Sequence, residues 1–95
     1  RHAFVQFRRA LRLRFELLGF AHRPYSRAER GRIEAVLAGA SIADTARLHV
    51  ALADWAADAV DVALELAHVR TDAVTAIAFP GQTMWHEPPT VSFQL

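Results

Sequence analysis

The strongest constraint on the fold of this 95-residue chain is a long amphipathic pattern in its second half. Apolar residues recur there at steps of three and four: Leu48, Leu52, Trp55, Ala59, Val62 and Leu66. The opposite side of the same helix would carry carboxylates: Asp54, Asp58, Asp61 and Glu65. Such a pattern predicts a helix with one buried face, on which Trp55 is a core residue. Ser41 and Asp44 offer its N-terminal cap, and it should end near His68.

A shorter helix should precede the long one. The run from Ser26 to Glu29 has the form of a capping box, in which the serine hydroxyl accepts from the Glu29 amide and the Glu29 carboxylate reaches back. This helix should continue to about Ala38, where Gly39 closes it.

Strands are predicted on both sides of the helix pair. Residues 11–17 alternate between apolar and charged side chains, which is typical of a half-buried strand. Residues 3–7 are expected to form a hairpin with it, and the second strand should continue through Gly19 towards His22. Pro24 then ends the pairing, because proline has no amide hydrogen.

After the long helix, residues 73–79 are almost entirely apolar and too few for a helix, which fits a strand buried on both faces. A polar loop should follow at residues 80–89, and residues 90–95 should form a last strand. The resulting order is strand, strand, helix, helix, strand, loop, strand. It predicts an α/β fold in which the helices form a right-handed crossover between strands.

The polar loop is the candidate ligand site, because open α/β sheets bind ligands beyond the carboxyl ends of their strands. Gly81, Gln82 and Thr83 combine a flexible backbone with an amide and a hydroxyl, which can hydrogen-bond a sugar or a phosphate. The structural alternative is a tight turn in which Pro80 and Gly81 supply the bend.

Further along the loop, His86 and Glu87 could act as a general acid and base, since a carboxylate can orient an imidazole. The alternative is a solvated loop that Pro88 and Pro89 hold extended. Trp85 could stack on a ligand and close a cleft, or pack locally.

Composition narrows the possible functions. The net charge is +1 and the arginines are dispersed, so nucleic acid is not an expected partner. A basic strand face formed by Arg8, Arg9, Arg12 and Arg14 would lack the aromatic residues on which RNA bases stack. The histidines show no ligand spacing and cysteine is absent, so no metal site is expected. Without a long apolar run or a signal-peptide pattern, no membrane association is expected and the cytoplasm is the default location.

Residues 76–89 resemble the anhydro-N-acetylmuramic acid kinases. In that family the strand after the first long helix ends in His-Gly-Gln-Thr, followed by an aromatic or basic residue and His-x-Pro. Here the run is Pro80-Gly81-Gln82-Thr83-Met84-Trp85-His86-Glu87-Pro88. The similarity extends over nearly the whole chain, since residues 16–25, the helix pair and residues 90–95 follow in the family's order.

The resemblance implies an actin-like ATPase fold with a ribonuclease-H-like sheet, of which residues 1–95 would be a single partial domain, a segment of the first of two domains. Enzymes of this family use ATP with Mg and water to open the anhydro ring of a cell-wall amino sugar and phosphorylate its 6-oxygen. By resemblance, Gln82 and Thr83 would line the site for this small-molecule sugar, with His86 and Glu87 nearby.

Two departures from the family pattern favour an alternative, a non-catalytic binding or interaction module with the same fold. Pro80 replaces the family histidine, which removes a hydrogen-bond donor. The family's phosphate loop would precede Arg1, and its catalytic aspartate would follow Leu95. Strand edges left unpaired for this reason would recruit a partner, so we expect a piece of a larger protein or association into a homodimer.

Overall fold

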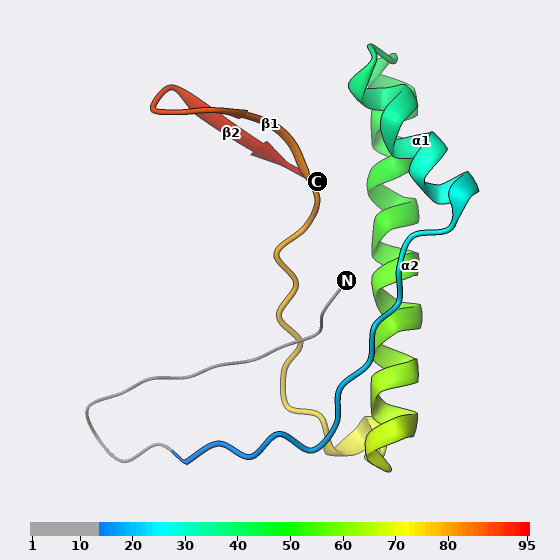
Figure 1. The fold of residues 1–95 in the computed structure, drawn as a ribbon, viewed down its shortest axis with the longest axis vertical. Helices are drawn as coiled ribbons and strands as arrows, with labels where there is room; N and C mark the ends of the chain where they lie inside the picture. The colour runs from blue at the N-terminus through cyan, green and yellow to red at the C-terminus, as the bar shows by residue number, and fades with distance from the viewer. Residues whose placement is uncertain (1–13) are drawn as a thin grey trace.

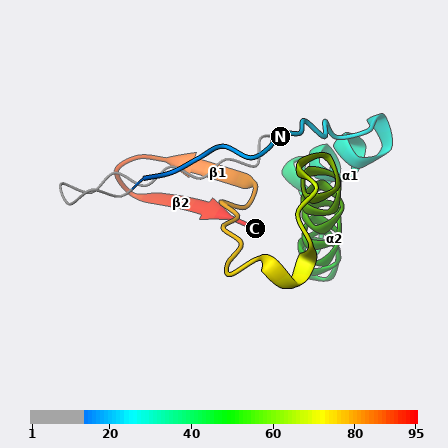
Figure 2. The same cartoon turned by 90° about the horizontal axis from the view of Figure 1, so that it is seen from below.

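The computed structural model describes residues 14–95. The elements follow in the order α1 (Arg27–Leu37), α2 (Ile42–Ala67), the 3-10 turn η1 (Thr71–Ala73), β1 (Thr83–Glu87) and β2 (Val91–Gln94). Two helices are thus followed by a two-stranded antiparallel hairpin. Figure 1 shows the chain after η1 running back beside α2 towards the hairpin, and Figure 2 shows the hairpin to one side of the helix pair.

The capping box predicted for α1 is confirmed. The Glu29 amide donates to the Ser26 hydroxyl over 3.1 Å, and the Ser26 amide donates to the Glu29 carboxylate over 2.8 Å. The helix ends at Leu37, and Gly39 follows with a φ of +110°, a conformation that glycine adopts without strain.

The predicted bounds of the long helix are confirmed as well. The Ser41 hydroxyl accepts from the Asp44 amide over 3.0 Å at the start of α2. At the other end, His68 takes the left-handed conformation that commonly ends a helix.

The core lies where α1, α2 and the hairpin meet. Its buried residues are Ile33, Leu48, Leu52 and Met84, and Tyr25, Val36, Trp55 and Leu95 pack against them. Leu48 and Leu52 are 1% and 2% exposed, so the predicted apolar face of α2 is the core face in its first half. In the second half of α2 the same face is open, and Leu66 is 60% exposed.

The strand predicted at residues 73–79 is wrong. Ala73 ends the 3-10 turn, and residues 74–82 form neither helix nor strand. Ile77 is 64% exposed and Phe79 44% exposed, so the segment is not buried on both faces. A strand requires a hydrogen-bonding neighbour, and no backbone hydrogen bond joins the segment from Thr75 to Ala78 to any other described residue.

The loop predicted at residues 80–89 is also wrong for half of its length, because Thr83–Glu87 forms β1. The strand predicted at residues 90–95 is confirmed by β2. In the hairpin Trp85 lies opposite Phe93, and a register shift lies between Thr83 and Trp85. Met84 is the one residue of β1 that is buried, so the hairpin attaches to the core by this side chain.

The first strand of the predicted N-terminal hairpin, residues 3–7, and the start of the second strand lie outside the described residues. The rest of the second strand was predicted from residue 14 towards His22, and residues 14–21 form no strand. The described strands are adjacent in sequence and antiparallel, so residues 14–95 contain no helical crossover between parallel strands.

Candidate functional site

The candidate site begins at the base of the hairpin. The backbones of Gln82 and Leu95 exchange two hydrogen bonds, of 2.8 and 2.9 Å. Gly81 precedes this pair with a φ of +79°, and a Cβ atom there would collide with the carbonyl oxygen of Leu95. Glycine is therefore required at this position, and the backbone of Gln82 is held firmly against the end of β2.

Four residues are linked by hydrogen bonds at this base; we call Tyr25, Gln82, Thr83 and Gln94 the amide cluster. The Tyr25 hydroxyl donates to Gln82 Oε1 over 3.1 Å. Gln82 Nε2 donates to the Thr83 carbonyl oxygen over 3.1 Å, and Gln94 Nε2 donates to the Thr83 hydroxyl over 3.2 Å. Two of the predicted site residues, Gln82 and Thr83, are thus brought together.

The other two predicted site residues lie towards the turn of the hairpin. His86 is paired with Ser92, whose hydroxyl lies 3.4 Å from its Nδ1 atom. The Glu87 carboxylate accepts from the Trp85 indole over 2.9 Å. His86 and Glu87 are adjacent on a strand, where successive side chains point to opposite faces. The structure therefore does not bring them together as an acid and base pair.

Sequence reasoning did not single out Tyr25 or Gln94 as site residues. Tyr25 precedes the cap of α1 and is separated from Gln82 by 57 positions. Gln94 faces Thr83 only because the strands pair with this register. No local sequence pattern marks either residue as part of a site. If residues 83–87 had been predicted as a strand, its pairing with the last strand would have placed Gln94 opposite Thr83.

A cavity of about 560 Å³ lies next to the amide cluster, between α2 and the segment after η1. Its lining includes Tyr25, Trp55, Phe79 and Pro80, together with a row of small residues on α2: Ala53, Ala56, Ala57, Ala59 and Val60. This volume is within the range of small-molecule sites, which are mostly apolar with a few polar groups.

A smaller cavity of about 340 Å³ adjoins the hairpin base and is lined in part by His49, Pro80, Gly81 and Gln94. The amide cluster contributes one residue to each cavity, Tyr25 to the larger and Gln94 to the smaller. Gln82 and Thr83 line neither cavity and reach them only through hydrogen bonds to these two partners.

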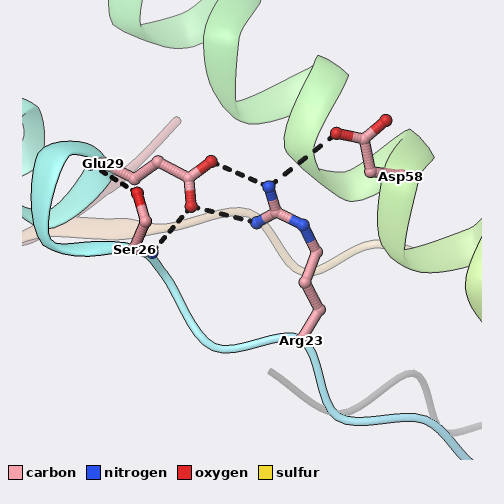
Figure 3. Close-up of polar contacts among 4 residues, drawn as sticks. All are labelled: Arg23, Ser26, Glu29 and Asp58. Atoms are coloured by element: carbon pink, nitrogen blue, oxygen red, sulfur yellow. Dashed lines mark hydrogen bonds and ion pairs between the residues drawn. The ribbon is translucent and has the colours of Figure 1, made fainter.

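Arg23 is the only charged residue that lines the larger cavity within the described part of the chain. Figure 3 shows its guanidinium facing Glu29 of α1 and Asp58 of α2. Two hydrogen bonds of 3.2 and 2.8 Å join it to Glu29, and the nearest Asp58 oxygen is 3.8 Å away. The hydrogen bonds from Arg23 and from the Ser26 backbone lower the pKa of Glu29, and those to Glu29 raise the pKa of Arg23.

No cluster of three or more histidine, aspartate or glutamate side chains suited to a metal ion occurs in residues 14–95. Over the same residues, no helix is both long and apolar enough to cross a bilayer.

Comparison of the sequence with known protein families gives a match. The family model for anhydro-N-acetylmuramic acid kinase matches residues 4–95. The chain belongs to the anhydro-N-acetylmuramic acid kinase family, and the resemblance seen in the Gly-Gln-Thr motif is confirmed. The family implies that the chain is a segment of an actin-like ATPase fold. No curated protein and no solved structure gave a match to the chain.

The family is ATP-dependent, but the described residues do not fit a nucleotide site on their own. Residues 14–95 contain no glycine-rich phosphate-binding motif. The guanidinium of Arg23 is engaged by Glu29 and faces Asp58, which leaves it poorly suited to a triphosphate.

Proposed function

We propose that this chain forms one wall of the sugar site of an ATP-dependent anhydro-sugar kinase. The family match over residues 4–95 is the observation that carries the proposal. The amide cluster supports it, because amide and hydroxyl groups beside a concave surface are the usual partners of sugar hydroxyl and ether oxygens.

Within this proposal, Gln82 and Thr83 bind the amino sugar at the hairpin base. His86 and Glu87 are assigned to the same substrate, as contacts to its outer part, because both are exposed at the far end of β1. ATP and Mg would be held mostly by other parts of the enzyme. By the resemblance to this family, the reaction would open the anhydro ring with water and phosphorylate the 6-oxygen.

The proposal is tested on the complete gene product with anhydro-N-acetylmuramic acid, by coupling the release of ADP to a spectrophotometric assay. We expect turnover in the wild type and a fall of roughly 10-fold or more in kcat/KM for Thr83→Ala, because the variant loses the hydroxyl. Thr83→Ser keeps the hydroxyl and serves as the matched control. Absence of turnover in the wild type would refute the kinase assignment.

A second candidate is a sugar-binding module without catalysis. Pro80 favours it, because this residue lines both cavities at the position where the family has a histidine. Calorimetry separates the two functions: sugar binding without ADP release supports the module, whereas turnover that increases in Pro80→His supports a kinase with a weakened site.

We also propose a cytoplasmic location and association into a homodimer. The family supports the location, since its substrate is a small intermediate of cell-wall recycling. The exposed segment from Thr75 to Ala78 supports association, because its backbone forms no hydrogen bond with residues 14–95 and its Ile77 side chain is open to solvent.

A further inference from the structure

The amide group of Gln82 has one defined orientation in the amide cluster. A backbone carbonyl can only accept, so the contact with the Thr83 carbonyl identifies the donating atom as Nε2. Oε1 therefore faces the Tyr25 hydroxyl, which must donate to it over 3.1 Å. If the amide were turned over, the two carbonyl oxygens would face each other. The Thr83 carbonyl therefore sets which way the amide faces, and the Tyr25 hydroxyl holds its oxygen in place.

Tyr25 is itself held by the core. Its ring meets the Trp55 ring edge to face, with 5.8 Å between centroids, and the Arg32 guanidinium lies 5.7 Å from the centre of the Trp55 ring. Tyr25 also packs against the buried cluster. The Tyr25 ring is therefore held against Trp55 of α2, and its hydroxyl holds the side chain of Gln82 at a fixed place relative to that helix.

The same cluster determines which hydrogen bonds remain for a ligand. The Thr83 hydroxyl oxygen accepts from Gln94, so its hydrogen is left to donate. Gln82 Nε2 uses one hydrogen on the Thr83 carbonyl and keeps the second. The cluster therefore keeps one N–H on Gln82 and one O–H on Thr83 for ligand oxygens that accept, such as ether, carbonyl or carboxylate oxygens.

We propose that Tyr25 is a positioning residue for the sugar site: it holds the Gln82 amide so that Gln82 Nε2 donates to an acceptor oxygen of the ligand. This inference rests on the proposed function, and it adds a residue that acts through Gln82. Removing the Tyr25 hydroxyl should weaken sugar binding while leaving nucleotide binding unchanged.

The test is a double-mutant cycle in the complete gene product. Tyr25→Phe removes one oxygen and keeps the ring against Trp55. We expect a rise of about three- to ten-fold in KM for anhydro-N-acetylmuramic acid, the size of one lost hydrogen bond, with the KM for ATP unchanged. In a Gln82→Leu background, Tyr25→Phe should have no further effect.

Thr45→Val is the matched control, because it also removes a hydroxyl that forms one hydrogen bond, to the Ser41 carbonyl oxygen over 3.0 Å at the start of α2. It should leave both KM values unchanged. An unchanged sugar KM in Tyr25→Phe, or an effect of equal size in the Gln82→Leu background, would overturn the positioning role.

A second measurement separates this inference from the proposed function. The side-chain amide signals of Gln82 in a nitrogen–proton NMR spectrum should move towards the values of a free glutamine in Tyr25→Phe and stay in place in Thr45→Val. If the wild type neither binds nor phosphorylates the sugar, the proposed function fails, and these signals still decide whether Tyr25 orients Gln82. Unmoved signals in Tyr25→Phe overturn the inference.

Discussion

At the scale of single residues, Arg23 joins more of the structure than any other charged side chain described. It lies in the segment before α1, forms two hydrogen bonds to Glu29 of α1 and faces Asp58 of α2. The side chains of Arg23 and Glu29 are 24% and 14% exposed, so water screens this pair less than an ordinary surface ion pair. The contact fixes the angle at which the chain enters α1 and forms part of the cavity wall.

This ion pair predicts a particular dependence of stability on pH. The Arg23 hydrogen bonds lower the pKa of Glu29 in the folded protein. The pair therefore stabilises the fold fully above the unfolded glutamate pKa of about 4.3, and this contribution is lost as the pH falls through the lowered folded value. Glu29→Gln keeps a residue suited to the capping box, and it removes the charge together with one of the two oxygens that accept from Arg23.

We expect Glu29→Gln to lower the free energy of unfolding by about 1–2 kcal/mol at pH 7, the usual size for hydrogen bonds to a charged group. Urea unfolding of the wild type and the variant at pH 7 and pH 3 measures this difference. It should shrink at pH 3, where the wild type approaches loss of the same charge. A difference that stays constant across this range would show that the carboxylate charge does not stabilise the fold.

At the scale of elements, α2 is the scaffold on which the site is built. Its buried residue Leu48 is 1% exposed, whereas Val50 on the same helix is 61% exposed. Leu48→Ala should lower the free energy of unfolding by about 2–5 kcal/mol, because it removes buried methyl groups and leaves a cavity. Val50→Ala should change it by less than about 0.5 kcal/mol. Chemical denaturation of both variants checks the prediction, and equal effects would contradict the assigned core face.

The elements also show what local sequence could predict. Both helices follow from short-range signals, namely the caps at Ser26 and Ser41 and the apolar spacing around Leu48. The strands were harder. Residues 73–79 are apolar enough for a buried strand but have no hydrogen-bonding neighbour among the described residues. Residues 83–87 lie in the predicted loop, yet they form a strand because β2 pairs with them. Strand pairing is a property of distant residues, and the segment alone does not encode it.

The same reasoning applies to the candidate site. The motif identified the consecutive residues Gln82 and Thr83, and the structure adds the hydrogen bonds that join them to Tyr25 and Gln94. It could not identify Tyr25 as the partner of Gln82, because that contact depends on how α1 and the hairpin pack together. The expected pairing of His86 with Glu87 assumed a loop, and the strand separates them instead.

At the scale of the whole molecule, much apolar surface remains open. Among the described residues, side chains exposed by 44% or more include Phe15, Leu17, Phe20, Ile77, Phe79, Trp85 and Phe93. Their number is large for a chain with six buried apolar residues in its described part. Exposed apolar surface of this extent is typical of a surface that another polypeptide covers.

Self-association of the chain can therefore be tested at one position. Ile77→Lys places a charge on the exposed segment from Thr75 to Ala78, whose backbone forms no hydrogen bond with other described residues. We expect this charge to raise the Kd of the proposed homodimer by at least ten-fold. Val50→Lys is a control of similar exposure on α2 and should leave the dimer intact. Analytical ultracentrifugation over a range of concentrations measures both. A monomeric wild type, or equal effects of the two variants, would exclude this segment as the dimer contact.

The two tryptophans give the molecule separate optical reporters. Trp55 is half-buried between Tyr25 and Arg32 at the wall of the larger cavity, while Trp85 is exposed on the hairpin and donates to Glu87. Their fluorescence should differ in emission wavelength and in access to a soluble quencher, because one indole is shielded and the other is hydrated. A ligand entering the cavity would therefore alter the blue-shifted emission, and a rearrangement of the hairpin the red-shifted one.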